Sequence, residues 1–326
     1  MKNFLRRCVG TLVLGAATAG SLPALAYSSL TVFGDSLSDT GNILLATGGT
    51  TPAAPYASGR FSDGPIWIDV LAEGLTLPAG AVPSLIGGSN YAFGGARTGT
   101  GSNPPGLLAQ AGGLWAPSHA AADPDGLYVV VGGGNDLRDA RGAASTPESR
   151  QAAAQAAAGN IASVVGLLAS RGAQHVLISN VPDLGNTPEA AALGLTAESS
   201  DVTQRYNLLV AGLVPLLQAQ FSGLTVSFLD MAGLAADIRH DALANGGALY
   251  GITNVSTPCG DFPGSVGISC SVSSFSDALH PSAATHALIG QAALAAVAAV
   301  PEPGTWLLMA LGLGALSLRR RAALAR

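Results

Sequence analysis

The stretch Leu30–Asn42 reads LTVFGDSLSDTGN. Its first four residues are apolar and predict a buried strand, which Gly34 ends with an abrupt turn. Asp35 and Ser36 stand at that turn, ahead of a predicted helix. A serine at this position is held by the strand and lies near free backbone N–H groups, which suits a nucleophile. The simpler interpretation is that Asp35 or Ser36 only caps the helix, so the rest of the chain has to decide.

Two glycine-rich segments follow further along the chain. Residues 89–99 read SNYAFGGARTG, and the paired glycines allow a tight turn with close backbone approach. Residues 127–131 form an apolar strand that runs into GGGND at 132–136, which places Asn135 at the carboxyl edge of a sheet. A side-chain amide is an uncharged donor that suits an oxyanion. An ordinary glycine loop and a turn asparagine are the simpler interpretations.

An acid and an imidazole lie close together near the end of the chain. Asp277 precedes His280 by three residues, so one turn can bring the carboxylate to the ring. The carboxylate would then fix the tautomer and leave the second ring nitrogen as a base for Ser36. Such pairs also occur as helix caps or surface pairs. The remaining histidines show no comparable partner, and we expect an ordinary core or surface role for His286.

In this order, the segments resemble the GDSL (SGNH) ester hydrolases, in the form of their lipase and acylhydrolase branch. The resemblance covers residues 28–300 and extends to GRFSDG at 59–64, where we expect Arg60 to be structural. It implies a catalytic triad and an oxyanion hole, without a metal or organic cofactor. The implied triad is Ser36, Asp277 and His280. The implied oxyanion donors are the backbone N–H groups of Ser36 and Gly95, with Gly94 less favoured, and the side-chain amide of Asn135.

Apolar strands alternate with helices along the chain, which predicts an α/β fold with a parallel sheet. Together with the resemblance, this indicates a three-layer α/β/α sandwich of the SGNH-hydrolase, flavodoxin-like type, with about five strands. We expect the helix at 197–221 to be bent or interrupted by Gly212 and Pro215. Residues 246–276 are expected to form a loop. The other expected elements are strands at 127–131, 175–180 and 224–229 and helices at 146–171, 230–245 and 282–300.

The first 26 residues have the features of a secretory signal peptide. A basic start precedes a short apolar stretch, and residues 24–26 read Ala-Leu-Ala. A membrane anchor is the less favoured alternative, because the apolar stretch is short and broken by Gly and Pro. The mature chain is therefore expected to begin at Tyr27.

The last 26 residues form a second unusual segment. Pro-Glu-Pro at 301–303 precedes an apolar stretch at 306–318 and three arginines at 319–321. A last core helix is the alternative, but the proline break and the arginines argue against it. The segment resembles a PEP-CTERM sorting signal of Gram-negative bacteria. That resemblance implies export to the periplasm or outer surface, transient anchoring in the inner membrane, removal of the tail by an exosortase-type enzyme, and an association with exopolysaccharide production.

The expected domain at 27–300 is strongly acidic. It holds eight arginines, no lysine and 19 carboxylates, a formal balance of −11. Such a domain is not expected to bind nucleic acid or to hold anionic lipid through a basic patch. Cys259 and Cys270 are its two cysteines and, in an exported chain, favour a disulfide over a metal site.

The sequence as a whole predicts a secreted serine esterase or lipase that acts on carboxylic esters. Its expected partners are an acyl lipid or an acylated glycan as the substrate and the sorting enzyme. An alternative from the sorting tail is a deacetylase of an extracellular polysaccharide. A surface or matrix binding protein with little turnover is a further alternative, although such a protein would not need an intact Ser36, Asn135 and His280.

Overall fold

A four-stranded parallel sheet forms the centre of the molecule, seen in a computed structural model that describes residues 27–101 and 103–298. Its strands are β1 (Leu30–Gly34), β2 (Leu127–Val131), β3 (His175–Ser179) and β4 (Thr225–Leu229), in the order β1-β2-β3-β4. Every residue of β1 and β2 is buried. Both faces of these strands are covered, which is why they appear in the sequence as unbroken apolar runs.

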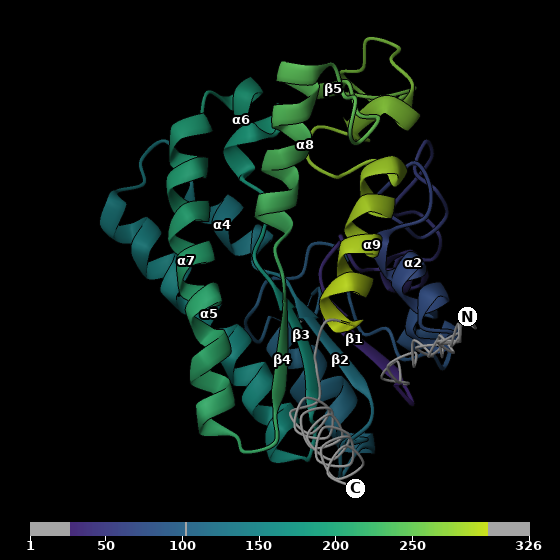
Figure 1. Cartoon of the computed structure of the whole chain (residues 1–326), viewed down its shortest axis with the longest axis vertical. Coiled ribbons are helices and arrows are strands. Elements are labelled where there is room, and N and C mark those ends of the chain that lie inside the picture. The colour runs from purple at the N-terminus through teal and green to yellow at the C-terminus, as the bar shows by residue number, and fades with distance from the viewer. Residues whose placement is uncertain (1–26, 102, 299–326) are drawn as a thin grey trace, which may run out of the picture.

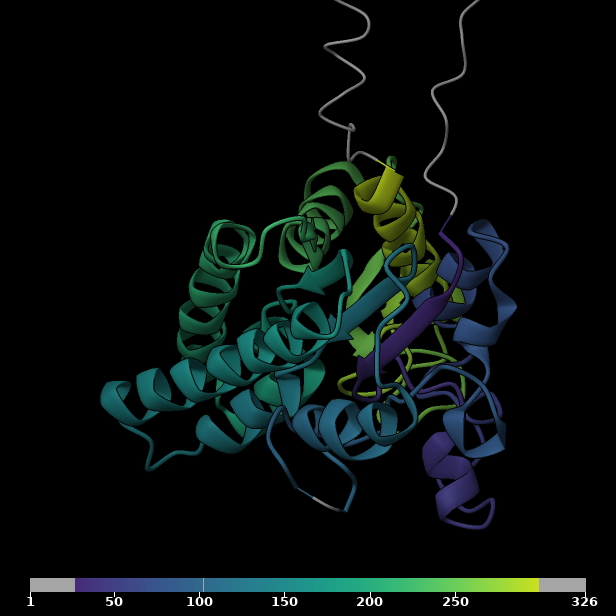
Figure 2. The same cartoon turned by 90° about the horizontal axis from the view of Figure 1, so that it is seen from below.

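Helices cover both faces of the sheet, as Figures 1 and 2 show. α5 (Pro147–Ser170) and α7 (Thr196–Gln220) pack on one face, where Tyr128 and Val130 of β2 point. α2 (Trp67–Gly74) and α9 (Ala283–Ala298) pack on the other, together with the start of α8 (Met231–Asn245) and with Val129 of β2. The predicted three-layer α/β/α architecture is therefore confirmed.

The sheet has four strands where about five were predicted. The place beside β1, opposite β2, is taken by residues 89–93, which form one isolated bridge between Val32 and Asn90. Tyr91 N–H donates to the Val32 carbonyl at 2.7 Å, and Phe93 N–H donates to the Gly34 carbonyl at 3.2 Å. Because the chain then turns away at the paired glycines, the pairing stays too short to form a regular strand. It nevertheless brings Gly95 next to the end of β1.

Two further expectations need correction. Residues 246–276 are not only a loop, because β5 (Asn254–Pro258) and β6 (Ser273–Phe275) pair in parallel as a separate two-stranded sheet. α7 is continuous through Pro215. A proline removes only one backbone donor, and the buried Val210 and Leu217 on either side of it keep the helix packed.

α5 is long and apolar enough to cross a membrane by length and composition alone. In this structure its buried side chains, among them Ile161 and Val165, pack in the core beneath α7. The shorter α-helices are α1 (Asn42–Ala46), α3 (Leu107–Ala109), α4 (Gly134–Ala140) and α6 (Pro188–Leu193). The short 3-10 or π turns are Pro78–Ala81, Ser84–Ile86, Gln110–Trp115, Ala116–Ser118, Leu184–Asn186 and Cys270–Val272.

The predicted signal peptide at 1–26 and the sorting segment at 301–326 lie outside the described residues. The hydroxyl of Tyr27, the first of the described residues, donates to the carbonyl of Val297 at 3.1 Å. The first residue of the expected mature chain therefore lies beside the last turn of α9.

Candidate active site

The loop that carries Ser36 is fixed from both sides of β1. A Cβ on Gly34 would lie 2.8 Å from the carbonyl oxygen of Val131, so only glycine allows β1 and β2 to come this close. The Gln110 side chain accepts the Gly34 N–H at 2.9 Å and donates to the Gly34 carbonyl at 2.8 Å. Ser36 follows this anchored strand end and is 8 % exposed. The nucleophile candidate is thus held on a rigid element.

The structure brings the three predicted triad residues into one hydrogen-bonded row. Nε2 of His280 lies 2.9 Å from Oγ of Ser36, and Nδ1 of the same ring lies 2.6 Å from Oδ2 of Asp277. Ser36 is 244 positions from His280 in the chain. This geometry gives the ring one nitrogen that can accept the serine proton and another that donates to a carboxylate.

Both oxygens of Asp277 are fully engaged. Oδ1 accepts the backbone N–H groups of Leu279, at 2.7 Å, and His280, at 2.5 Å. Oδ2 accepts the imidazole Nδ1–H and also the hydroxyl of Tyr56. Burial by itself would raise the pKa of Asp277, but the hydrogen bonds from His280 and Tyr56 outweigh it and hold this pKa well below its ordinary value. The carboxylate therefore stays ionised beside the ring.

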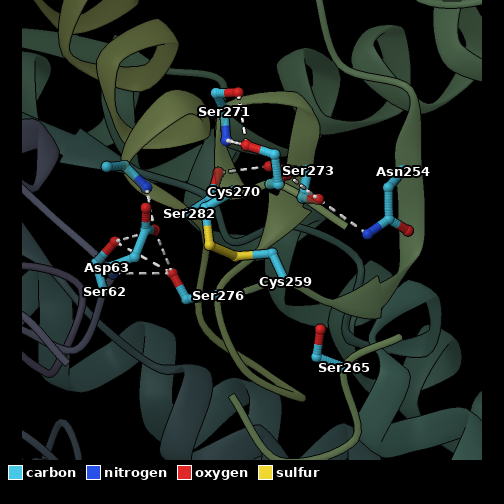
Figure 3. Close-up of a disulfide and its surroundings, with 12 residues drawn as sticks. Ser62, Asp63, Asn254, Cys259, Ser265, Cys270, Ser271, Ser273, Ser276 and Ser282 are labelled. Carbon is cyan, nitrogen blue, oxygen red and sulfur yellow. Dashed lines mark hydrogen bonds between the residues drawn. A yellow bond between two sulfur atoms is a disulfide. The ribbon is translucent and has the colours of Figure 1, made fainter. Parts of the chain in front are cut away.

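The turn that carries Asp277 and His280 is attached to the loop before α2, and Figure 3 shows its first residue, Ser276, beside Ser62 and Asp63. The hydroxyl of Ser276 donates to Oδ1 of Asp63 at 2.8 Å. The same carboxylate oxygen accepts the N–H of Ala283 in the first turn of α9, also at 2.8 Å. The hydroxyl of Ser62 donates to the Pro281 carbonyl at 3.0 Å. GRFSDG thus supports the turn that carries Asp277 and His280 through Ser62 and Asp63.

Cys259 and Cys270 are joined by a disulfide, which confirms that prediction (Figure 3). The N–H of Cys259 donates to the carbonyl of Ser276 at 3.1 Å. Since Ser276 immediately precedes Asp277, the closed loop is fastened to the chain just ahead of the acid.

The three candidate oxyanion donors come from three separate segments. The N–H groups of Ser36 and Gly95 have no hydrogen-bond acceptor among the described residues. Ser36 and Asn135 line the cleft described below, whereas Gly95 is not among its lining residues. Gly95 has a φ of 79°, which favours glycine at this turn. Asn135 lies in the first turn of α4, where one amide hydrogen donates to the Ala96 carbonyl at 2.9 Å and the other remains available.

The buried carboxylate of Asp39 joins the loop that carries Ser36 to the loop that carries the paired glycines at 94–95. Asp39 was not among the site residues predicted from the sequence. Asp39 accepts the N–H groups of Gly41 and Asn42, at 2.8 and 2.7 Å, and that of Gly94 at 2.7 Å. The side-chain amide of Asn42 then donates to the carbonyls of Asn90 and Ala92, at 2.8 and 2.9 Å. The sequence offers one signal for Asp39 and Asn42, which is that both are polar residues close after Ser36. Their partners lie about 50 residues further along the chain, so the sequence does not identify them.

A second buried acid lies directly before Ser36 in the chain. Asp35 is 4 % exposed, and burial raises its pKa from the ordinary 3.8 to about 6. The backbone N–H of Leu37, 3.0 Å from Oδ1, and the nearby His280 partly offset this effect. The folded protein therefore favours the protonated form of Asp35 more strongly than water does.

The other residues named from the sequence have structural positions. Arg60 pairs with Asp69 through two hydrogen bonds of 2.8 and 2.6 Å. His286 is fully buried, with Nδ1 accepting the Trp67 N–H at 3.3 Å, and burial lowers its pKa to about 3. The remaining histidines are His119, His175 and His240, and none of them lines the cleft described next.

A cleft opens beside Ser36 and His280. Its empty volume, including the part open to solvent, is about 1170 Å³. Its walls are mostly aliphatic and come from α8, α9, β6 and the loop after β3. Apolar lining residues include Leu37, Val181, Leu184, Met231, Leu234 and Ile238. The cleft thus combines a reactive polar end with a long apolar wall, the general form of a small-molecule site.

A family model described as GDSL-like Lipase/Acylhydrolase matches residues 30–293. The chain belongs to this family. A second model, the PEP-CTERM protein-sorting motif, matches residues 299–321. Both resemblances seen in the sequence are thereby confirmed.

Relatives of this GDSL-family chain include a phosphatidylcholine-sterol acyltransferase of Aeromonas hydrophila, 28% identical over 65% of this chain and 61% of the relative. An uncharacterized protein in the trpE-trpG intergenic region of Pseudomonas putida is 29% identical over 90% of this chain and 52% of the relative. The chain thus spans between about half and three fifths of the length of these two relatives. Among solved structures, a carbohydrate acetylesterase from Sinorhizobium meliloti is 18% identical, with 83% of this chain and 98% of that chain covered and a TM-score of 0.43.

Proposed function

We propose that this protein is a serine hydrolase of carboxylic esters that works through an acyl-enzyme. The single observation that carries the proposal is the row from Ser36 Oγ through the His280 ring to Asp277, with contacts of 2.9 and 2.6 Å. Its membership of the GDSL-like family supports the same conclusion.

In the first half of the reaction, Oγ of Ser36 attacks the ester carbonyl while Nε2 of His280 takes its proton. The ring becomes an imidazolium, which the ionised Asp277 stabilises. The charge that develops on the carbonyl oxygen is bound by Ser36 N–H, Gly95 N–H and the Asn135 amide. His280 then gives its proton to the leaving alcohol, and the acyl group stays on Ser36.

In the second half, a water molecule takes the place of the alcohol. His280 accepts a proton from this water, whose oxygen attacks the acyl-enzyme carbonyl. Collapse of the second tetrahedral intermediate breaks the bond to Ser36 Oγ, and the serine recovers its proton from the ring. The net reaction consumes one water and releases one acid and one alcohol.

The substrate we propose carries an aliphatic acyl chain. The cleft beside Ser36 is lined by many aliphatic side chains, and most of the surface that it exposes is apolar. Burying an acyl chain there is favourable by roughly 0.8 kcal/mol per CH₂ group.

A second candidate is an esterase that removes acetyl groups from an extracellular glycan. The observation in its favour is the sorting motif at 299–321. We propose accordingly that residues 1–26 direct export, that residues 27–300 are the catalytic domain, and that an exosortase-type enzyme removes the tail.

Hydrolysis of p-nitrophenyl esters with acyl chains of two to sixteen carbons tests both candidates, using the chain beside Ser36→Ala. Ser170→Ala is the matched control, because this serine is exposed and far from the triad in the sequence. We expect activity that is abolished only in Ser36→Ala and that rises with acyl length. Activity confined to acetate would favour glycan deacetylation, and activity retained in Ser36→Ala would refute the proposed nucleophile.

A further inference from the structure

Tyr56 makes a side-chain contact with the triad from outside it. It lies in the loop between α1 and α2, 221 positions before Asp277 in the chain, and its hydroxyl donates to Oδ2 of Asp277. This oxygen is the same one that accepts Nδ1–H of His280. Two donors therefore share one carboxylate oxygen, and one of them, Tyr56, lies outside the motifs from which the site was predicted.

The Tyr56 ring is held by aromatic neighbours. It packs edge-on against Phe262, with centroids 4.8 Å apart, and against Phe61 at 5.9 Å. Phe61 in turn lies 5.2 Å from the imidazole of His280. These rings cover one side of the His280–Asp277 pair, and both members keep only 13% of their side-chain surface exposed. A phenol held in this way has little freedom to turn its hydroxyl towards water.

The loop closed by the disulfide supplies Phe262, the more deeply buried of the two phenylalanines that contact Tyr56. Phe262 is 4 % exposed, and its N–H donates to the carbonyl of Cys259 at 3.1 Å. Cys259 is bonded to Cys270 and fastened to Ser276, one residue before the acid. The disulfide loop thus fixes both the hydroxyl donor, through Phe262, and the carboxylate acceptor, through Ser276.

We propose that Tyr56 is a positioning residue for the Asp277–His280 pair, an inference that rests on the proposed ester hydrolysis. Its hydroxyl holds Oδ2 in line with the ring and takes up part of the negative charge that this oxygen presents to the imidazolium. Tyr56 touches no reacting atom and acts only through Asp277. Through Asp277, Tyr56 thus sets both the orientation of the His280 ring and how strongly that ring holds its proton.

Tyr56→Phe removes the hydroxyl and keeps the ring. Because one hydrogen bond to a charged group is lost, kcat/KM should fall by about tenfold, mainly through kcat. The carboxylate then presents more charge to the imidazolium, so the acidic limb of the kcat/KM profile should move to higher pH. A purely packing role would lower kcat and leave this limb in place. Tyr250→Phe is the matched control, because its hydroxyl has no hydrogen bond among the described residues.

Three further measurements complete the test: the first addresses folding, the second isolates the coupling to Asp277, and the third needs no turnover. Melting curves should show Tyr56→Phe folded at the assay temperature. In the Asp277→Asn background, Tyr56→Phe should change kcat/KM by less than twofold, because the N–H groups of Leu279 and His280 hold the amide oxygen and its NH₂ group replaces the shared oxygen. The low-field proton resonance of the Nδ1–H bond, read by NMR, should shift in Tyr56→Phe alone, even if no ester is turned over. An unmoved pH limb and an unmoved resonance in folded Tyr56→Phe would overturn the proposal, whereas absent ester hydrolysis with a shifted resonance would refute only the proposed function.

Discussion

The carboxylate of Asp39 accepts the backbone N–H of Gly94 at 2.7 Å and so joins the nucleophile loop to the glycine loop beside it. Three more N–H groups, those of Gly41, Asn42 and Ile43, converge on the same side chain. Asp39 is fully buried, so these donors have no access to solvent as an alternative partner. Together with the amide of Asn42 and the Phe93 N–H bond to Gly34, this side chain ties the loop of Ser36 to the segment that carries Gly95.

Asp39→Ala should both destabilise the fold and impair catalysis. Several buried donors would lose their partner, which predicts a loss of about 3–5 kcal/mol in the free energy of unfolding. Asp39→Asn keeps one acceptor oxygen and should lose less. Urea unfolding measures the first effect and kcat on a short-chain ester the second. Equal stability of the three proteins would contradict the role assigned to Asp39.

Asn135→Ala should lower kcat by about 10²–10³ with little change in KM, because an oxyanion donor acts in the transition state. Asn245→Ala is the control, since this residue lies exposed at the end of α8. The measurement is steady-state kinetics on one ester at fixed pH. A rise in KM with unchanged kcat would show instead that Asn135 binds the ground state.

Asp35 should make the stability of the fold depend on pH. Its pKa is raised from 3.8 to about 6 in the fold, so the folded state favours the protonated form. Its contribution is most favourable below pH 3.8, declines as the pH rises and reaches a penalty of about 3 kcal/mol above pH 6. Asp35→Asn should therefore stabilise the protein at pH 8 by roughly 1–3 kcal/mol and hardly at all near pH 3.5. Chemical unfolding of both proteins across this range gives the comparison, and a difference that does not vary with pH would contradict it.

Reduction of the Cys259–Cys270 disulfide should lower the free energy of unfolding by about 2–3 kcal/mol, because the bond closes a short loop in the unfolded chain. The measurement is urea unfolding of the oxidised and reduced protein. Mass spectrometry of the exported protein should first show a two-hydrogen deficit, and two free thiols there would refute the bond.

Ala235→Phe should shorten the acyl chains that the enzyme accepts. Ala235 lines the aliphatic cleft from α8, and a ring at this position would fill part of it. We expect turnover of acetate and butyrate esters to be largely kept and turnover of the longest esters to fall at least tenfold. Ala244→Phe, on an exposed part of the same helix, is the control. An unchanged length profile would place the acyl chain elsewhere.

The sequence by itself determined the four strands of the central sheet, the main helices and the residues of the candidate site. These four strands are covered on both faces, so each appears as a short apolar run. Such a run can be recognised from its own residues, without knowing which strand it pairs with. Ser36, Asn135, Asp277 and His280 lie within segments whose residues carry their own signal, and the spacing of Asp277 and His280 already allowed contact. The count of strands was wrong, because residues 89–93 lie along β1 without forming a regular ladder.

Only the tertiary structure decided what holds these residues in place. Tyr56 reaches Asp277 across 221 positions, and Gln110 reaches Gly34 across 76. Such side chains have no local pattern, because a single tyrosine or glutamine looks the same in the sequence whether its side chain is exposed to solvent or hydrogen-bonded to a distant residue. Their roles arise because the sheet brings the ends of distant segments to one edge, where buried polar groups must find partners that the local chain does not offer.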